Sequence, residues 1–431
     1  MDSTDVIVVG AGFAGLITAR ELAQRGLKVV VLEARDRIGG RTWTDYRLGR
    51  DLEMGGTWVH WSQPHAWAEI SRYGLEVVRS PQSEETYWLE GESLRRGTPE
   101  EFMKLITPGM AKLTQDFATA IPRPDCPLLS PFIHEHDQYT LQERMDSLEL
   151  SEHEVHANEA AWVGHMNGPL TETGFTSALR WTAAAGSWEI MHTASATFKL
   201  REGTRRFAEC IAEDSDAEIR LNAQVTSINH DIQGAAVTVN HHETIRASRL
   251  VLTLPQNLLH QLEIHPTLSE SKTQPSQAQA ASRGTKTWIK VRGKIKPFAA
   301  YSTAHHPFSV VKTEFIGEND SILVAFGADS SRINGNDIEA VAEALQVWRN
   351  DLEVLDSAAH DWMADPFSQE TWFIQRPQQM TKYLLEQQEA EGVVHFATSD
   401  YANHWPGFID GAIESGLRVA RTILTKMPDP E

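Results

Sequence analysis

The chain has 431 residues, of which 41% are hydrophobic and 23% are charged, a balance typical of globular proteins. This length predicts about two or three domain-sized units. Its 59 Asp and Glu residues outnumber its 39 Lys and Arg residues, which gives a formal net charge of −20. Because an acidic surface repels phosphate backbones and anionic lipids, the charge argues against nucleic acid and membranes as partners.

The sequence lacks the usual signals of export and of disulfide scaffolds. No apolar run approaches the roughly 20 residues that span a bilayer, and no basic segment or apolar leader precedes the first predicted strand. The two cysteines, Cys126 and Cys210, form no CxxC pair, and we interpret both as free thiols. We therefore expect a cytoplasmic protein. The oligomeric state is not defined by the sequence, and a homodimer is one option.

The first 40 residues carry a pattern typical of dinucleotide binding. The apolar run from Val6 to Val9 predicts a buried parallel strand, and Gly10, Gly12 and Gly15 follow it in GxGxxG spacing. These glycines permit a tight turn, a close approach of a pyrophosphate to the backbone, and close packing of the next helix on the sheet. That helix, expected from about Phe13 to Arg25, directs its free N–H groups at the phosphates.

A second predicted strand, from Lys28 to Leu32, ends at Glu33. The Glu33 carboxylate is placed to accept hydrogen bonds from both hydroxyls of an adenosine ribose, and an acid there disfavours NADP. The segment that follows is basic and rich in glycine, with Arg35, Arg37, Gly39, Gly40, Arg41 and Thr42. A plain NAD site needs no such continuation.

The stretch LEARDRIGGRTWT resembles the signature of the flavin-containing amine oxidases, and the resemblance extends in order over nearly the whole chain. It implies that the cofactor is FAD and that Arg41 approaches its phosphates. The other residues that it adds to the FAD site are Ala34, Arg35, Gly40, Gly56, Thr57, Val225, Asp400 and Ile409.

Three of these residues take specific roles by the resemblance. Val225 matches a valine whose backbone holds the adenine ring, and Ile409 matches a residue whose N–H meets the flavin carbonyl. Asp400 matches an acid near the ribityl chain and pyrophosphate, where the family usually has glutamate. The mammalian monoamine oxidases bond the flavin through a cysteine near the position of Trp372. No cysteine lies in that region here, so we expect non-covalent FAD.

The segment LEMGGTWVHWSQP bears on the substrate. On its residues alone it is a glycine turn that leads into an aromatic core patch; in the similar family it lines the substrate cavity. Trp58 stands where L-amino-acid oxidases have an arginine, and His60 stands where polyamine oxidases have a glutamate. A histidine at this position resembles the bacterial hydroxynicotine oxidases. We therefore expect a mostly apolar amine with one polar feature, and we expect His60 to contact it.

Helical patterns rich in Trp, His and Met fill residues 136–200. His165 and Asn167 can place polar groups in the cavity, or they are a core histidine and a turn asparagine. We take Asn167 as a substrate contact. No spacing of His, Cys or carboxylates in this region makes a set of metal ligands, and we expect no metal.

Thr285 to Val291 alternate as a strand, with Lys286, Lys290 and Arg292 on one face. On the residues alone this is a solvated face. In the similar family a flavin-facing lysine begins such a strand and holds a water against flavin N5, so the resemblance makes Lys286 the catalytic residue, with Lys290 as the alternative. The resemblance also makes Trp372 and Phe408 an aromatic cage for the substrate; otherwise they are core residues.

Together these features predict an α/β two-domain flavoprotein with a Rossmann-like FAD-binding domain and an inserted α+β substrate domain. We expect residues 1–80, 203–285 and 391–431 in the FAD-binding domain, and residues 81–202 and 286–390 in the substrate-binding domain. The expected function is that of an FAD-dependent amine oxidase. A hydride passes from the carbon next to the amine nitrogen to flavin N5, which yields an imine and, with oxygen, hydrogen peroxide.

The expected substrate is a secondary or cyclic, nicotine-like amine. Three alternatives stay open: an oxidase of primary aliphatic or aromatic monoamines, a desaturase or dehydrogenase with a non-oxygen acceptor, and a flavin-binding scaffold without activity.

Overall fold

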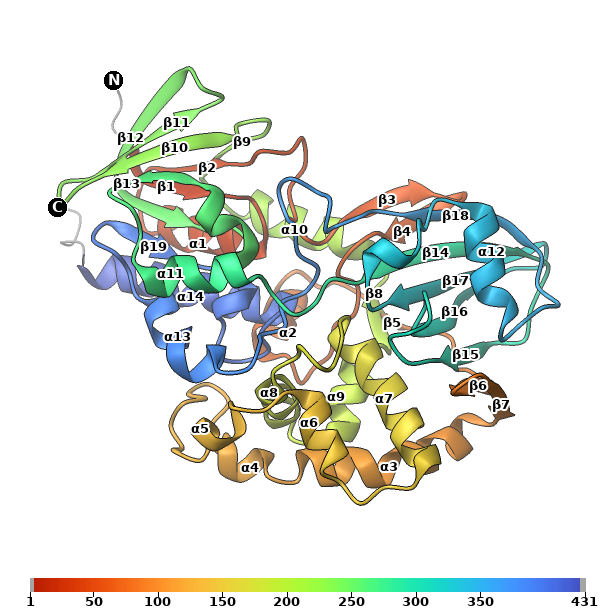
Figure 1. Cartoon of the computed structure of the whole chain (residues 1–431). Helices are drawn as coiled ribbons and strands as arrows, with labels where there is room; N and C mark the ends of the chain where they lie inside the picture. The colour runs from red at the N-terminus through yellow and green to blue at the C-terminus, as the bar shows by residue number, and fades with distance from the viewer. Residues whose placement is uncertain (1–3, 427–431) are drawn as a thin grey trace.

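The computed structural model describes residues 4–426 and builds them around two large sheets (Figure 1). The first sheet has eight strands in the order β13-β10-β11-β12-β1-β2-β9, and β19 also pairs with β12. Its strands are β1 (Thr4–Val9), β2 (Val29–Leu32), β9 (Glu218–Arg220), β10 (Val225–His230), β11 (Ala235–Val239), β12 (Glu243–Leu252), β13 (Glu263–His265) and β19 (Val394–Phe396).

The centre of this sheet is parallel and apolar. β1 pairs in parallel with both β2 and β12, and β12 pairs in parallel with β19. Parallel strands are covered on both faces, which is why these segments are runs of Val, Ile and Leu. Helices α1 (Phe13–Ala23), α10 (Gly203–Glu213) and α14 (Ile409–Lys426) pack with α2 (Pro64–Arg72) in one apolar cluster on one face. The strands predicted at residues 6–9 and 28–32 are present, and the first helix ends two residues before the predicted Arg25.

The second sheet has seven strands in the order β18-β14-β17-β16-β15-β6-β7 and is antiparallel except where β15 meets β6. Its strands are β6 (Glu85–Glu90), β7 (Ser93–Gly97), β14 (Thr285–Arg292), β15 (Phe298–Tyr301), β16 (Val310–Ile316), β17 (Asp320–Gly327) and β18 (Val354–Ala359). Helix α12 (Ile338–Gln346) packs Val341 and Leu345 against the core of this sheet.

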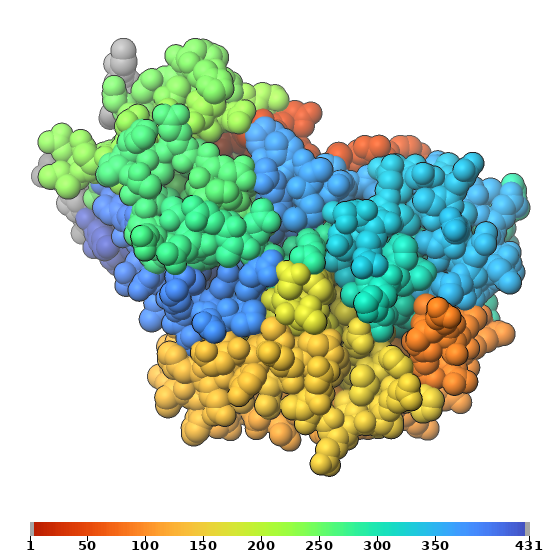
Figure 2. Space-filling view, in the orientation of Figure 1, coloured from red at the N-terminus to blue at the C-terminus, as the bar shows by residue number. Residues whose placement is uncertain are grey.

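A helical segment lies below both sheets in Figure 1 and comprises α3 (Pro99–Thr114), α4 (Phe117–Ala120), α5 (Ile133–His136), α6 (Leu141–Asp146), α7 (Glu152–Met166), α8 (Phe175–Ala185) and α9 (Trp188–Ala194). Thr98, Thr140 and Ser151 start α3, α6 and α7 with capping boxes, each side chain accepting from the N–H three residues later. Figure 2 shows this segment packed against the strands of the second sheet, where α7 contacts β15 and β16.

Short elements connect these parts. They are β3 (Thr44–Arg47), β4 (Arg50–Glu53), β5 (Val77–Arg79), β8 (Phe198–Leu200), α11 (Glu270–Ala278), α13 (Gln379–Gln388) and the 3₁₀ turns η1 (Gln256–Gln261), η2 (Ser330–Arg332) and η3 (Ser399–Tyr401). β5 precedes the helical segment in the sequence and β8 follows it. Because β5 pairs with β8, the two ends of this part of the chain lie side by side. Across residues 4–426, none of the helices combines the length and apolar character that crossing a membrane requires.

Candidate active site

A cavity of about 550 Å³ lies where the two sheets and the helical segment meet. This volume falls in the range of about 300–1,000 Å³ that is usual for small-molecule sites. Fifteen of the residues predicted for the site line it: Gly10, Gly12, Glu33, Ala34, Arg35, Gly40, Arg41, Gly56, Thr57, Asn167, Val225, Lys286, Trp372, Phe408 and Ile409. Gly15, Asp400 and His60 do not line it.

The glycine turn between β1 and α1 allows a ligand to approach the backbone closely. Gly10 has a φ of +103°, which L side chains rarely adopt, and a Cβ added to Gly15 would lie 2.0 Å from the Gly10 carbonyl oxygen. A Cβ on Gly40 would lie 3.1 Å from the Cα of Gly12. Gly12 precedes α1 and provides no side-chain cap, so the first N–H groups of the helix are free to meet an anion. This arrangement fits the pyrophosphate of a dinucleotide.

Two alanine variants of this turn should separate packing from ligand contact. Gly15→Ala forces a methyl group into the Gly10 carbonyl, and we expect overpacking of about 1–3 kcal/mol to lower the melting temperature of the FAD-free protein. Gly12→Ala meets only the Gly40 Cα at 3.7 Å but projects into the cavity, so it should preserve that temperature and weaken FAD retention. Thermal melts and FAD occupancy check both results; a Gly12→Ala protein with full FAD affinity would remove the close-approach argument.

Glu33 is buried at the end of β2 and its carboxylate is held by the backbone. Oε2 accepts from the Ala11 N–H at 2.8 Å and Oε1 accepts from the Arg35 N–H at 2.9 Å. Arg35 in turn donates to Asp365 Oδ1 at 2.7 Å. Val225 lines the same cavity from β10. The acid expected for the ribose is therefore fixed in orientation beside the glycine turn.

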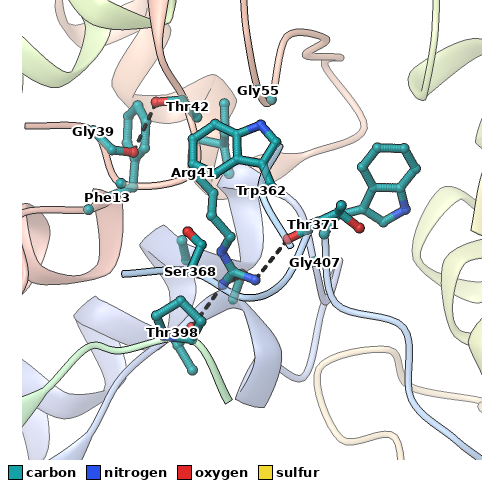
Figure 3. A pocket seen from close by; sticks show the side chains of 18 of the residues that line it. Phe13, Gly39, Arg41, Thr42, Gly55, Trp362, Ser368, Thr371, Thr398 and Gly407 are labelled. Atoms are coloured by element: carbon teal, nitrogen blue, oxygen red, sulfur yellow. Dashed lines mark hydrogen bonds between the residues drawn. The ribbon is translucent and has the colours of Figure 1, made fainter. Parts of the chain in front are cut away.

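Arg41 forms an ion-pair cluster with two buried carboxylates that lie far from it in the sequence. Figure 3 shows its guanidinium directed between Thr371 and Thr398. It donates to Glu370 Oε1 at 2.8 Å and to Asp400 Oδ1 at 2.6 Å, so both Nη atoms have partners within the chain. Asp400 lies behind the cavity wall, where it also accepts from the Gln256 N–H. Burial, followed by the charge of Asp400, raises the pKa of Glu370.

His60 departs from the expected substrate contact. It is buried outside the cavity lining, with Nδ1 2.9 Å from Ser62 Oγ and its ring centroid 3.9 Å from that of Trp61. Burial lowers its pKa. Trp58, two residues earlier, lines the cavity instead. Strict alternation would turn both side chains to one side, but a turn closed by the Gln63 N–H on the His60 carbonyl begins at His60.

Lys286, in contrast, reaches the cavity from β14. Its Nζ donates to the Gly55 carbonyl at 2.8 Å and to Thr57 Oγ1 at 2.6 Å, and it lies 5.2 Å from the ring centre of Trp58. Burial lowers the pKa of this amine from 10.5 to about 7. The alternative, Lys290, lies outside the cavity lining and pairs with Asp320 at 3.1 Å.

The aromatic residues of the cavity are held by their neighbours. Trp372 Nε1 donates to the His165 carbonyl at 3.1 Å, and its ring centre lies 6.0 Å from that of Phe326. Phe408 packs against Trp181 with a centroid distance of 4.9 Å. Asn167 ends α7 in the left-handed region and its Nδ2 donates to Thr371 Oγ1 at 3.1 Å.

Several residues that line the cavity were not predicted from the sequence. Lys312 lies on β16 and Phe326 on β17, and Trp362 packs beside Gly55, as Figure 3 shows. A Cβ on Gly55 would lie 2.9 Å from the Trp362 ring. The buried polar character of Lys312 gives no local signal, because a lysine in an alternating strand usually faces solvent.

One group of possible metal ligands occurs among the described residues, formed by His65, His404 and Asp410, whose ligand atoms lie within 4.8 Å of one another. Asp410 Oδ1 accepts from the backbone N–H groups of His65 and Ala66 at 2.7 and 2.9 Å, and Oδ2 lies 3.2 Å from His65 Nδ1. These contacts join the N-terminus of α2 to that of α14. Hydrogen bonding explains the cluster, and we assign no metal to it.

Comparisons with known proteins agree with this architecture. The chain is 35% identical over 423 residues to pseudooxynicotine dehydrogenase from Pseudomonas sp, covering 96% of this chain and 85% of that protein. It is 26% identical over 442 residues to (S)-6-hydroxynicotine oxidase from Paenarthrobacter nicotinovorans, covering 97% and 99%. The structure of putrescine oxidase bound to putrescine superposes with a TM-score of 0.86 at 23% identity, covering 98% and 99%. The last match concerns the fold alone, and it confirms the predicted two-domain α/β fold.

The family model described as "Flavin containing amine oxidoreductase" matches residues 13–424. That span includes the helix after the glycine turn, the strand of Lys286 and most of the C-terminal helix α14. The chain therefore belongs to the flavin-containing amine oxidoreductases and is an FAD-dependent enzyme that oxidises an amine.

Proposed function

We propose that this enzyme oxidises a secondary or cyclic amine of the nicotine type in the cavity between the two sheets. The observation that carries the proposal is that Lys286, Trp372 and Phe408 line the same cavity as Gly10 and Gly12 of the glycine turn. The residues proposed to bind the nucleotide and the aromatic residues proposed to contact the substrate thus line one cavity.

FAD fits the residues present, and its adenosine end would be held by Glu33 and Val225, its pyrophosphate by the turn at Gly10 and Gly12 with the start of α1, and its flavin by Ile409. When bound, FAD would supply the redox chemistry, as acceptor of the hydride that the carbon next to the amine nitrogen loses when the amine becomes an imine. We further propose that residues 1–80, 203–285 and 391–431 form the FAD-binding domain and residues 81–202 and 286–390 the substrate-binding domain.

The chain's own residues bind and orient the amine. Trp372 and Phe408 would flank it, their positions fixed by the His165 carbonyl and by Trp181. Because these walls are apolar and Lys286 lies close by, an ammonium ion is disfavoured and the amine binds in its neutral form. Asn167 would add a polar contact beside Thr371.

Lys286 Nζ is the group that can hold a proton or a water at the reaction centre. It keeps Gly55 and Thr57 as fixed partners and has a pKa lowered to about 7 by burial, so near neutral pH it exists in both protonation states. A group with such a pKa suits general acid–base catalysis.

The nicotine-like substrate class is supported by the relatives, which are named for nicotine, pseudooxynicotine and 6-hydroxynicotine. We propose oxygen as the electron acceptor, with hydrogen peroxide as product. A second candidate is a dehydrogenase that uses another acceptor, and the names of two relatives, pseudooxynicotine dehydrogenase and nicotine dehydrogenase, favour it.

An anaerobic titration of the FAD-containing enzyme tests both points. We expect nicotine-like and other secondary or cyclic amines to bleach the flavin absorbance, and primary monoamines and polyamines to do so far more slowly. Admission of air should restore the absorbance within seconds and release hydrogen peroxide. Fast bleaching with slow recovery in air would identify the dehydrogenase, and no bleaching by any amine of the panel would overturn the proposal.

A further inference from the structure

A polar patch interrupts the aromatic wall of the cavity. It consists of Lys312 on β16, His192 on α9 and Ser195 directly after α9, all three lining the cavity; we call it the lysine subsite. The mechanism proposed above uses none of them. Buried polar groups beside a ligand cavity usually fix the orientation of a ligand.

Lys312 belongs to a buried charge network with an excess of positive charge. Its Nζ lies 3.3 Å from Glu314 Oε2, and the same carboxylate accepts from Lys199 and from Ser80 Oγ, the latter at 2.8 Å. The Glu314 side chain is fully buried, and the Lys199 and Lys312 side chains are 14% exposed. Two amines share one carboxylate, so a second ammonium ion from a ligand would be repelled here.

Lys312 also has hydrogen-bonding capacity to spare. Over residues 4–426, the hydrogen-bond acceptor of its Nζ is the Ala196 carbonyl at 2.6 Å, whereas a lysine ammonium has three N–H donors. Nζ remains a donor even when it is neutral. The Lys312 ammonium is thus positioned by the chain and still able to donate to a group inside the cavity.

The histidines beside it add no charge. His165 Nε2 lies 3.1 Å from His192 Nδ1, and Ser195 Oγ lies 3.3 Å from His165 Nδ1. Burial lowers the pKa of His165 to about 3 and that of His192 to about 4, and Lys312 contributes to the second shift. At neutral pH both rings are uncharged, so the lysine subsite presents Lys312 as its single cation.

The subsite lies along the wall that starts at Trp372. The Trp372 ring neighbours Phe326 at 6.0 Å, Phe326 neighbours Trp58 at 5.8 Å, and Lys312 Nζ lies 4.3 Å from the Trp58 ring centre. Lys286 Nζ lies 5.2 Å from the same Trp58 ring centre, so Lys312 and the proposed reaction centre share one wall of the cavity. A substrate whose amine lies at Trp372 can thus present a second polar group to Lys312.

We propose that Lys312 is a specificity-determining residue that donates a hydrogen bond to an uncharged acceptor, a carbonyl oxygen or a pyridine-type nitrogen, at the end of the substrate remote from the amine. The same residue rejects diamines, whose second ammonium would face it. This inference rests on the proposed function, since it deepens the description of the substrate in that site.

A matched set of secondary amines tests the subsite: N-methyl-4-phenylbutylamine, its 4-oxo analogue with a carbonyl next to the ring, and N-methyl-1,4-diaminobutane. With the FAD-containing enzyme we expect kcat/KM to favour the ketone over the methylene amine by about 10- to 100-fold, because the carbonyl gains a bond to a charged donor. The diamine should be the poorest of the three.

Variants of Lys312 assign the preference. Lys312→Met should bring the ketone and methylene amines to within about threefold of each other, and Lys312→Gln should retain part of the ketone preference while it relaxes the rejection of the diamine. Glu314 keeps Lys199 as its partner in both variants, so the fold has a remaining counter-charge. Lys290→Met, outside the cavity, is the matched control and should preserve both preferences.

Two outcomes would overturn the inference: a wild-type enzyme that does not distinguish the ketone from the methylene amine, or a ketone preference that survives Lys312→Met. Anaerobic dissociation constants for the same amines keep the subsite testable when an amine is not oxidised. If the ketone binds more tightly and Lys312→Met removes the difference while no amine bleaches the flavin, the proposed function fails and the subsite stands.

Discussion

Lys286→Met should slow amine turnover by about 10²- to 10⁴-fold, the usual contribution of a positioned general acid or base, while FAD remains bound. Methionine has nearly the volume of lysine and keeps the contacts with Trp58 and Trp288, whose ring centres lie 5.2 and 5.0 Å from Nζ. What it loses is the donor to the Gly55 carbonyl and Thr57 Oγ1 and the capacity to hold a proton. Turnover and the FAD-to-protein absorbance ratio measure the two effects separately.

The pH dependence of stability and of turnover distinguishes a catalytic role of Lys286 from a purely structural one. Because burial lowers the pKa of Lys286 from 10.5 to about 7, the unfolded chain binds more protons than the folded chain between these values. The free energy of unfolding therefore gains a rising component from pH 7 upward, and Lys286→Met should lack it. If the neutral amine is the active form, wild-type turnover should also rise through about pH 7, and this limb should be absent in the variant.

Lys290→Met provides the control for Lys286→Met on the same strand. Lys290 lies four residues further along β14, pairs with Asp320 at 3.1 Å and lies outside the cavity lining. Its replacement should leave turnover within about twofold of wild type, because Lys290 lies outside the cavity lining and its ion pair is partly exposed to solvent. Equal turnover in the Lys286→Met and wild-type enzymes would remove Lys286 from the mechanism.

Local sequence patterns were sufficient for the nucleotide half of the molecule. The strand, the glycine turn, the helix and Glu33 are consecutive in sequence and contiguous in space, so spacing alone places Gly10, Gly12 and Glu33 on one cavity. Ile409, which was expected at the cofactor from the family resemblance, also lines the cavity, at the start of α14.

Contacts between segments that are distant in the sequence could not be predicted from local spacing. Arg41 meets Glu370 and Asp400 only because residues more than 300 positions apart fold together, and no local pattern connects them. Alternation on β14 suggests a solvated cationic face. In the structure Lys286 is 5% exposed, while the Arg292 side chain at the far end of the same strand is 62% exposed. Gly55 and Trp58 cover the end of the strand that carries Lys286. This contact joins segments that are distant in the sequence, so the pattern of β14 alone does not indicate it.

Tertiary contacts also decide the positions of Lys312, which the local pattern would place in solvent, and of His60, which the resemblance would place in the cavity. Lys312 and Glu314 alternate with Val311 and Thr313, which would usually place them in solvent, but the contact between β16 and the segment after α9 buries them. His60 was expected in the cavity because of its position by resemblance, yet the turn to Ser62 and the ring of Trp61 hold it outside.

Glu33→Ala should raise the dissociation constant of FAD by about 10- to 100-fold. The substitution removes the predicted acceptor for the ribose hydroxyls and also leaves the N–H groups of Ala11 and Arg35 without their partners at 2.8 and 2.9 Å. Loss of a hydrogen-bond partner costs about 1–3 kcal/mol, and each 1.4 kcal/mol is tenfold in affinity. FAD fluorescence released on dilution measures the change.

Exposed Asp36 lies three residues from Glu33, and Asp36→Ala is the matched control for a lost carboxylate charge. It should retain FAD as the wild type does. Because the Ala11 contact also shapes the turn, the melting temperature of the FAD-free Glu33→Ala protein must be measured beside the affinity. A lower affinity at an unchanged melting temperature assigns the effect to the ribose contact. Full FAD occupancy of Glu33→Ala after dialysis would contradict that assignment and move the adenosine away from the end of β2.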